Sequence, residues 1–280
     1  MLTDHLQERA PAAPALTPTA TRWPAWLFLG LVGASLVALL AAPWPLPMKL
    51  HAVLHGLCAQ RPSHSYWLGA NRLPFDARMT GIYGGFLLAA VGLLTRRRWR
   101  AARPPAWPLS ATLGLFVALM GADGVNSTLQ DFGLPYLYQP QNWLRLATGL
   151  LCGTALAVGL LYVLNTTLWA TVKDSPTLGG WGELAMLLAL DGLYALIVAS
   201  GWGLLYAPVG LWLVLGAAGA TFALVLAMVV LLRGRENRFA SLTDLAGHAC
   251  VALIVAYAAL AFLGGGRFLL ERALGISMGM

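Results

Sequence analysis

Charged residues are scarce in this sequence. Only 10% of the 280 residues are Asp, Glu, Lys or Arg, whereas 59% are hydrophobic. Soluble domains carry about 25% charged residues, so the composition excludes an ordinary soluble protein. It predicts a polytopic membrane protein that is surrounded by the lipid bilayer.

Cysteine and lysine are also rare. Cys58, Cys152 and Cys250 are too few and too far apart for a disulfide framework, and only Cys58 has polar neighbours. Two of the 18 basic residues are lysines, and this arginine bias is typical of a GC-rich bacterial genome. We therefore expect the bacterial cytoplasmic (inner) membrane as the location. The basic residues lie mainly in short loops, where they set membrane orientation, so we expect no nucleic-acid partner.

Long apolar runs account for most of the chain. Residues 1–24, rich in Pro, Ala and Thr, predict a disordered cytoplasmic tail. Residues 25–280 predict a single transmembrane helical domain, because a helix of about 20 apolar residues crosses the hydrocarbon core. The expected spans are 25–46, 79–95, 107–125, 144–166, 183–205, 208–232 and 244–264. The sequence therefore predicts an all-α bundle of about seven spans.

The positions of Lys and Arg predict how this bundle is oriented. The loop 96–103, RRRWRAAR, carries five arginines, and positively charged short loops stay in the cytoplasm. With this orientation the cytoplasmic side holds eleven Lys and Arg residues and the other side holds seven. The amino terminus is then inside, the carboxyl terminus is outside, and the polar segment 47–78 is extracytoplasmic.

The segment 47–78 concentrates potential metal ligands. On a short interfacial helix from residue 49 to about residue 60, the first three of them share an arc of roughly 60°. Imidazole and thiolate groups suit Zn²⁺, so one interpretation is a zinc site. The alternative is that the histidines face lipid headgroups or backbone carbonyls. The candidate ligands are His51, His55, Cys58, His64 and Asp76.

Two motifs in this region resemble a known family. Residues 58–65 read Cys-Ala-Gln-Arg-Pro-Ser-His-Ser, and residues 76–83 read Asp-Ala-Arg-Met-Thr-Gly-Ile-Tyr. They are similar to Cys-His-Gln-x-Pro-x-Arg-Ser and Cys-x-Arg-Cys-Thr-Gly-Ile-Tyr in the prokaryotic membrane family called domain of unknown function 2085. The resemblance covers about residues 45–160. It implies a functional site but no particular reaction.

The departures from the family pattern limit what this site can do. Ala59 stands where the family has His, and Asp76 and Met79 stand where it has the Cys-x-x-Cys pair. A dithiol redox role is therefore not available. Gly81 and Gly85 have the spacing that allows two helices to pack closely. The other candidate pocket residues from these motifs are Arg61, Arg78, Thr80 and Tyr83.

A second polar stretch, residues 123–145, is expected on the same side of the membrane. Asp123, Asn126 and Arg145 could join the first stretch in one polar pocket, under the aromatic residues of the connecting loop. An ion pair of Asp123 with Arg78 or Arg145 would neutralise charge at the membrane edge, so structural pairing and ligand binding are equal alternatives. Asp76 and Asp123 are the candidate catalytic bases.

Three ionisable residues are expected inside the spans. Asp191 falls midway along the fifth span, where an ionised carboxylate costs at least about 2.5 kcal/mol without a partner. Asp244 and His248 are four residues apart and could pair, and Asn165 could approach Asp191. These residues indicate either a proton or ion relay or a set of hydrogen bonds that fix the helices.

Three classes of function follow from these patterns. The first is an accessory or assembly subunit with a membrane-protein partner. The second is a metal-dependent enzyme that acts on a lipid or an exported substrate, and the third is a proton-coupled transporter. The sequence favours the accessory role slightly, because it explains the missing family cysteines.

Overall fold

The computed structural model describes residues 22–275, so the predicted tail lies almost entirely outside the described residues. Seven of the helices described are long and apolar enough to cross a membrane, and the strands have two to four residues each. The long helices are α1 (Trp23–Ala41), α3 (Ala77–Thr95), α4 (Trp107–Asp131), α5 (Asn142–Leu168), α6 (Trp181–Ala199), α7 (Tyr206–Leu232) and α8 (Leu242–Leu274). The predicted all-α polytopic bundle is confirmed.

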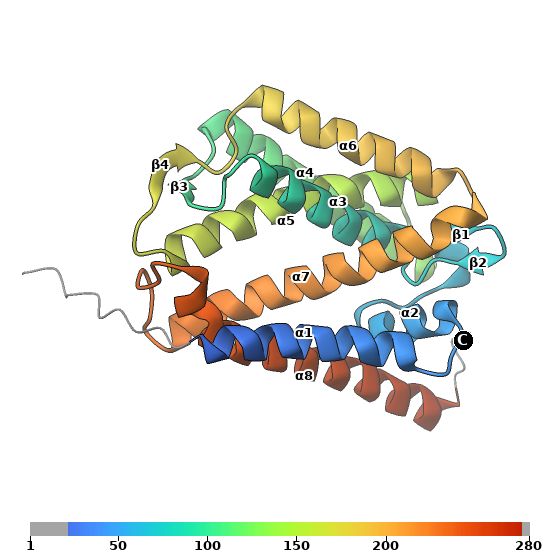
Figure 1. Ribbon diagram of the computed structural model, residues 1–280. Helices are drawn as coiled ribbons and strands as arrows, with labels where there is room; N and C mark the ends of the chain where they lie inside the picture. The colour runs from blue at the N-terminus through green and yellow to red at the C-terminus, as the bar shows by residue number, and fades with distance from the viewer. Residues whose placement is uncertain (1–21, 276–280) are drawn as a thin grey trace, which may run out of the picture.

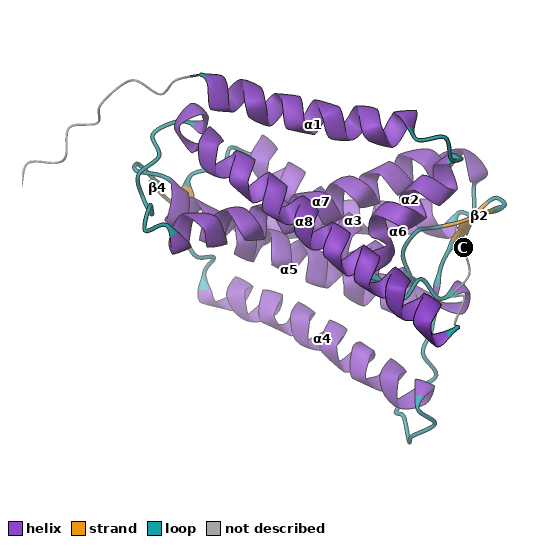
Figure 2. Ribbon diagram, turned by 90° about the horizontal axis from the view of Figure 1, so that it is seen from below, coloured by secondary structure: helices purple, strands orange, loops and turns teal. Residues whose placement is uncertain are grey.

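The long helices run side by side and place their connections at two ends (Figure 1). One end carries the short helix α2 (Leu46–Leu54) and the hairpin of β1 (Trp67–Leu68) and β2 (Asn71–Arg72). The opposite end carries β3 (Ala101–Arg103) paired in parallel with β4 (Lys173–Pro176). Figure 2 shows α1 and α4 as the outermost helices, on opposite sides of the others. We call the end with α2 and the hairpin the hairpin end.

Helix boundaries follow local sequence signals. Asp76 caps α3, because its carboxylate accepts a hydrogen bond from the Met79 amide at 2.8 Å. Ser241 and Asp244 form a reciprocal capping box at the start of α8. The predicted span 25–46 was too long at its end, because α1 stops at Ala41 just before two closely spaced prolines. The sequence-based boundaries of the other spans up to α7 agree to within about six residues.

Helix α8 differs most from the prediction. The three consecutive glycines at 264–266 were expected to end the last span, but the helix continues for eight residues beyond them. Gly56 approaches α8 so closely that an added Cβ would lie under 3.0 Å from the Gly264 nitrogen. Gly56 therefore permits close packing of α8 against the segment that follows α2, whereas added Cβ atoms at residues 264–266 would make no contact shorter than 3.8 Å.

Glycines also explain the closest pair of long helices. Added Cβ atoms at Gly81 and Gly85 of α3 would meet the α5 backbone, and those at Gly149 and Gly153 of α5 would meet the α3 backbone. Each of these contacts would be 3.0 Å or shorter at its nearest point. The predicted packing role of Gly81 and Gly85 is confirmed, and α5 supplies a matching pair of glycines. This packing fixes the starts of α3 and α5 side by side.

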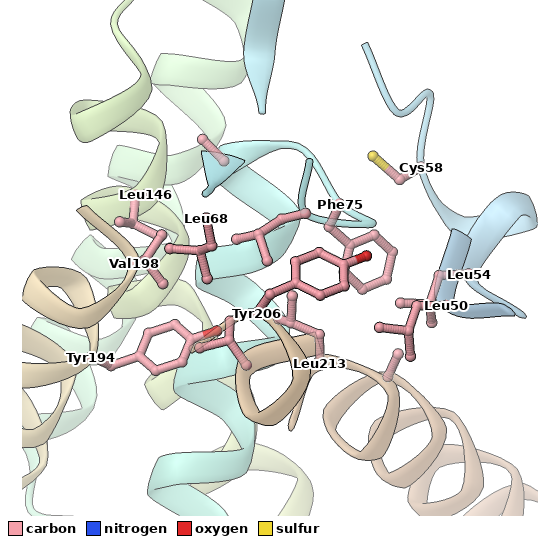
Figure 3. Packing of buried hydrophobic residues seen from close by; sticks show 14 of the residues in the cluster. Leu50, Leu54, Cys58, Leu68, Phe75, Leu146, Tyr194, Val198, Tyr206 and Leu213 are labelled. Atoms are coloured by element: carbon pink, nitrogen blue, oxygen red, sulfur yellow. The ribbon is translucent and has the colours of Figure 1, made fainter. Parts of the chain in front are cut away.

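A cluster of buried apolar side chains packs the hairpin end against the long helices. Figure 3 shows side chains from α2, the hairpin segment, α5, α6 and α7 gathered in this cluster. Leu50, Leu54, Leu68 and Phe75 are at most 1% exposed. Segment 50–75 is therefore anchored to the bundle and holds the polar residues that flank it in defined positions.

Candidate functional site

A polar pocket of about 130 Å³ lies at the hairpin end of the bundle. The loop after α2, the start of α3, the end of α4 and the start of α5 enclose it. The structure therefore brings together the two polar stretches that the sequence placed on one side. Its lining residues are Ala59, Arg61, His64, Asp76, Arg78, Ser127, Thr128, Asp131 and Arg145.

Arg78 is held by a buried carboxylate. Its guanidinium donates hydrogen bonds to the Asp123 carboxylate at 2.5 Å and to the Ser127 hydroxyl at 3.1 Å. Asp123 is 1% exposed and also accepts a hydrogen bond from the Tyr138 hydroxyl at 2.8 Å. The predicted Arg78–Asp123 ion pair is therefore present. Because Asp123 is enclosed behind Arg78, its position does not favour the role of catalytic base.

Asn126 shapes the loop beside the pocket without lining it. Its side-chain oxygen accepts a hydrogen bond from the Leu137 amide at 2.7 Å, and its amide group donates one to the Tyr138 carbonyl at 2.9 Å. Thr80 and Tyr83 do not line the pocket either. Thr80 is fully buried, and Tyr83 stacks on Phe75 with a centroid distance of 5.0 Å. These three predicted pocket residues support its walls.

The remaining two arginines of the pocket differ in their partners. Arg61 pairs with Asp131 at 2.5 Å, and both side chains are about one-third or more exposed. Arg145 is only 5% exposed and donates a hydrogen bond to the Asn142 side chain at 2.9 Å. Among the described residues, no ion pair joins Arg145 to a carboxylate. The predicted alternative pairing of Asp123 with Arg145 is therefore wrong, and Arg145 brings a buried positive charge to the pocket.

The two other titratable residues of the lining are already constrained. Burial, followed by the nearby charge of Arg145, lowers the pKa of His64, so its imidazole is neutral at pH 7. Asp76 caps α3, as described above, and its backbone amide donates a hydrogen bond to the Cys58 sulfur at 3.4 Å. The pocket therefore presents three guanidinium groups, a neutral imidazole and two carboxylates that already have partners.

The predicted zinc ligands do not converge. Helix α2 ends at Leu54, His55 lies in the 3₁₀ turn η1 (His55–Leu57), and Cys58 is extended, so the expected common helical face does not exist. His51 faces the Arg72 carbonyl at 3.2 Å. In the described part of the chain, no group of three or more His, Cys, Asp and Glu residues could hold a metal ion. The geometry therefore does not support a zinc site made by His51, His55, Cys58, His64 and Asp76.

Cys58 is buried, and backbone amides surround its sulfur. It is 7% exposed, and its sulfur accepts hydrogen bonds from the amides of Gln60 at 3.3 Å and Asp76 at 3.4 Å. Burial, and secondarily the charge of Asp76, raises the pKa of the Cys58 thiol to about 12. The thiol is therefore protonated at neutral pH and poorly suited to act as a nucleophile.

A second polar cluster joins α8 to the segment after α2. Glu271 faces the His55 imidazole at 3.1 Å and accepts a hydrogen bond from Arg267 at 2.7 Å. Arg267 also donates to the backbone carbonyls of His55, Cys58 and Ala59. This cluster was not predicted from the sequence, because the last span was expected to end at the glycines. The signal was the spacing of Arg267 and Glu271, which is that of an ion pair within one helix.

The predicted relay residues are separated. Asp191 is 4% exposed and accepts a hydrogen bond from Thr154 at 2.7 Å. Asn165 donates instead to the carbonyls of Arg98 and Ala101, so its expected approach to Asp191 is wrong. Asp244 caps α8 at an exposed position, and the His248 ring packs against Phe239 with a centroid distance of 5.0 Å. The expected pair of Asp244 with His248 is therefore absent too.

These features define a multi-pass α-helical membrane protein. Within this class, residues 58–160 match the model of the family described as "Predicted membrane protein (DUF2085)". The resemblance inferred from the two motifs is confirmed. The pocket residues from Ala59 to Arg145 all lie inside the matched segment. A search of curated proteins found no match, and neither did a search of solved structures.

Proposed function

We propose that this protein is a non-catalytic accessory subunit of the membrane that binds the anionic group of a ligand in its polar pocket. The observation that carries the proposal is the presence of Arg61, Arg78 and Arg145 around one cavity. Guanidinium groups bind carboxylate and phosphate oxygens through paired, charge-assisted hydrogen bonds. The cavity volume of about 130 Å³ gives a small oxyanion enough room.

Arg61 and Arg78 already have carboxylate partners, whereas Arg145 has no ion pair among the described residues, which favours an anion over a cation at its position. Asp131 is paired with Arg61, and Asp76 caps a helix, so neither carboxylate is free for a ligand. Arg145 is buried and lies in the first turn of α5, whose amino-terminal dipole adds positive potential. An oxyanion beside Arg145 would therefore offset a buried charge that no ion pair of the described residues neutralises.

The orientation remains part of the proposal. The arginine-rich loop 96–103 lies at the end of the bundle opposite the hairpin end (Figure 1). Because such loops stay in the cytoplasm, we place the pocket outside the bacterial cytoplasmic membrane, with the amino terminus inside. A ligand or a partner membrane protein would then reach the pocket from the extracytoplasmic side.

The two rival functions have less support from the geometry. A zinc-dependent enzyme needs convergent ligands and a free base, whereas the candidate ligands lie apart and Asp123 is enclosed. A proton-coupled transporter needs a chain of titratable groups, whereas Asp191 has Thr154 as its hydrogen-bond partner and Asp244 lies at a helix start. The pocket is the feature that these rivals leave unexplained.

Isothermal titration of the detergent-purified full chain with inorganic phosphate tests the proposal. Wild-type protein should bind phosphate saturably, and Arg145→Gln should weaken binding by about tenfold or more, as expected for a charged hydrogen-bonding group. Arg272→Gln is the matched control, because this exposed arginine lies at the same end but outside the pocket. Equal affinities of wild type and Arg145→Gln would contradict the proposal.

A further inference from the structure

An apolar groove lies beside the polar pocket. It has a volume of about 400 Å³ and runs between segment 56–59 and the last turns of α8. Leu57, Leu270 and Leu274 supply apolar side chains to its walls. Leu270 and Leu274 are 59% and 61% exposed, although they belong to a helix that packs on segment 56–59. The groove is therefore an open apolar surface of the described chain.

The groove and the pocket share a wall. Ala59 lines both of them, and its side chain is exposed. Arg267 fixes this wall by donating a hydrogen bond to the Ala59 carbonyl at 2.9 Å, and Glu271 holds Arg267 in place at 2.7 Å. A ligand with a charged group in the pocket could therefore extend an apolar chain past Ala59 into the groove.

The polar pocket lies at the depth expected for lipid headgroups. Arg78 is the second residue of its span, Asp131 is the last residue of another, and Arg145 is the fourth residue of a third. Aromatic side chains are exposed in the neighbouring loop and helix start, including Tyr136 at 46% and Trp143 at 61%. Such residues are typical of the boundary between hydrocarbon and headgroups. Lipid phosphates are the oxyanions that are concentrated at this depth.

We propose that the ligand is a phospholipid with an anionic headgroup, whose phosphate lies among Arg61, Arg78 and Arg145 and whose acyl chain lies in the groove. This inference rests on the proposed anion-binding function and adds the class of ligand. Free phosphate shares the headgroup chemistry but leaves the groove empty. The apolar contacts of the acyl chain should therefore make the lipid bind more tightly than free phosphate.

The test compares two probes on the full chain in detergent, namely inorganic phosphate and dioleoyl phosphatidylglycerol. The lipid should bind at least about tenfold more tightly than phosphate, because burial of acyl methylene groups adds to affinity. Leu270→Asn should remove most of this gain and leave phosphate binding unchanged. Leu269→Asn is the matched control, because Leu269 is 65% exposed on the same helix but does not line the groove. Leu274→Asn provides a second groove variant.

The possible results separate the inference from the proposal on which it rests. Saturable phosphate binding without tighter lipid binding would overturn the lipid inference and leave the anion pocket intact. The same conclusion would follow if both groove variants bound the lipid as well as Leu269→Asn does. Failure of wild-type protein to bind either probe would overturn both. Lipid binding that falls in Arg145→Gln and in the groove variants, but not in Leu269→Asn, would support both.

Discussion

The two ends of the bundle use arginine in different ways. At the end with β3 and β4, Arg98 lies 3.2 Å from the buried Glu183 carboxylate, and Arg100 lies against the rings of Trp99 and Trp169. Arg100 also donates a hydrogen bond to the Ala240 carbonyl at 2.7 Å. These arginines link the α3–α4, α5–α6 and α7–α8 connections. At the hairpin end, three arginines surround a cavity, and Arg145 has an amide as its side-chain partner.

The difference shows that the partners of an arginine, rather than the number of arginines, indicate a binding site. The loop 96–103 has the highest density of positive charge in the sequence, yet Arg98 and Arg100 donate hydrogen bonds to Glu183 and Ala240 of the protein itself. The hairpin end has fewer basic residues, but the fold directs them toward a common space.

The largest effect is expected from Glu183→Ala at the β3–β4 end. Glu183 is 7% exposed, and its loss leaves the partly buried Arg98 without its carboxylate. Breaking a buried pair typically costs 3–5 kcal/mol, so unfolding in detergent should show a loss of about 3 kcal/mol. Asp174→Ala is the control, because its pair with Arg103 is exposed on both sides and should contribute about 1 kcal/mol or less. Equal losses would contradict the structural role of Glu183.

A smaller loss of stability is expected from Asp123→Asn at the hairpin end. The substitution leaves Arg78 without its ion-pair partner, and loss of a charged hydrogen bond should cost about 2 kcal/mol. It also makes the pocket more positive, so affinity for phosphate should rise while stability falls. Denaturation and phosphate titration of the same preparation measure both quantities. A fall in phosphate affinity in a folded variant would contradict this expectation and show that Asp123 is needed to position Arg78 for phosphate.

A difference in thiol reactivity is expected between Cys58 and its neighbour. With its pKa raised to about 12, Cys58 remains protonated at pH 8 and should react slowly with a membrane-impermeant maleimide. A cysteine introduced by Ala59→Cys is exposed and should react readily from outside intact cells. Fast labelling of both residues would contradict the buried position of Cys58, and labelling of the new cysteine only after lysis would reverse the orientation.

Apolar run length was sufficient to predict most of the fold. The predicted span 208–232 starts within two residues of α7, because a run of so many consecutive apolar residues is typical of a membrane span. The end of α8 was misplaced, because the glycines at 264–266 do not break the helix, which packs closely on Gly56, a residue distant in the sequence. A glycine run weakens an isolated helix, but tertiary contacts can outweigh this local cost.

The sequence indicated which two stretches lie close together, but not the local backbone that positions their side chains. The two polar stretches belong to one pocket because they occupy span ends on the same side, which the order of spans alone determines. The zinc interpretation required a continuous helix through Cys58. The chain instead forms a 3₁₀ turn that begins at His55, and its backbone is extended at Cys58. Gln60 has positive φ and donates hydrogen bonds to the carbonyls of His51 and Pro74, so tertiary contacts stabilise this bend. Helical periodicity carries no information about such contacts.

Thermal unfolding with and without inorganic phosphate tests the central claim most directly. Phosphate should raise the unfolding temperature of wild-type protein, because a ligand that binds the native state stabilises it. Arg145→Gln should unfold near the wild-type temperature and lose the phosphate effect, whereas Arg98→Gln should unfold at a lower temperature and keep that effect. The opposite pattern, in which Arg98→Gln loses the phosphate effect and Arg145→Gln keeps it, would contradict the assignment of the anion site to the hairpin end.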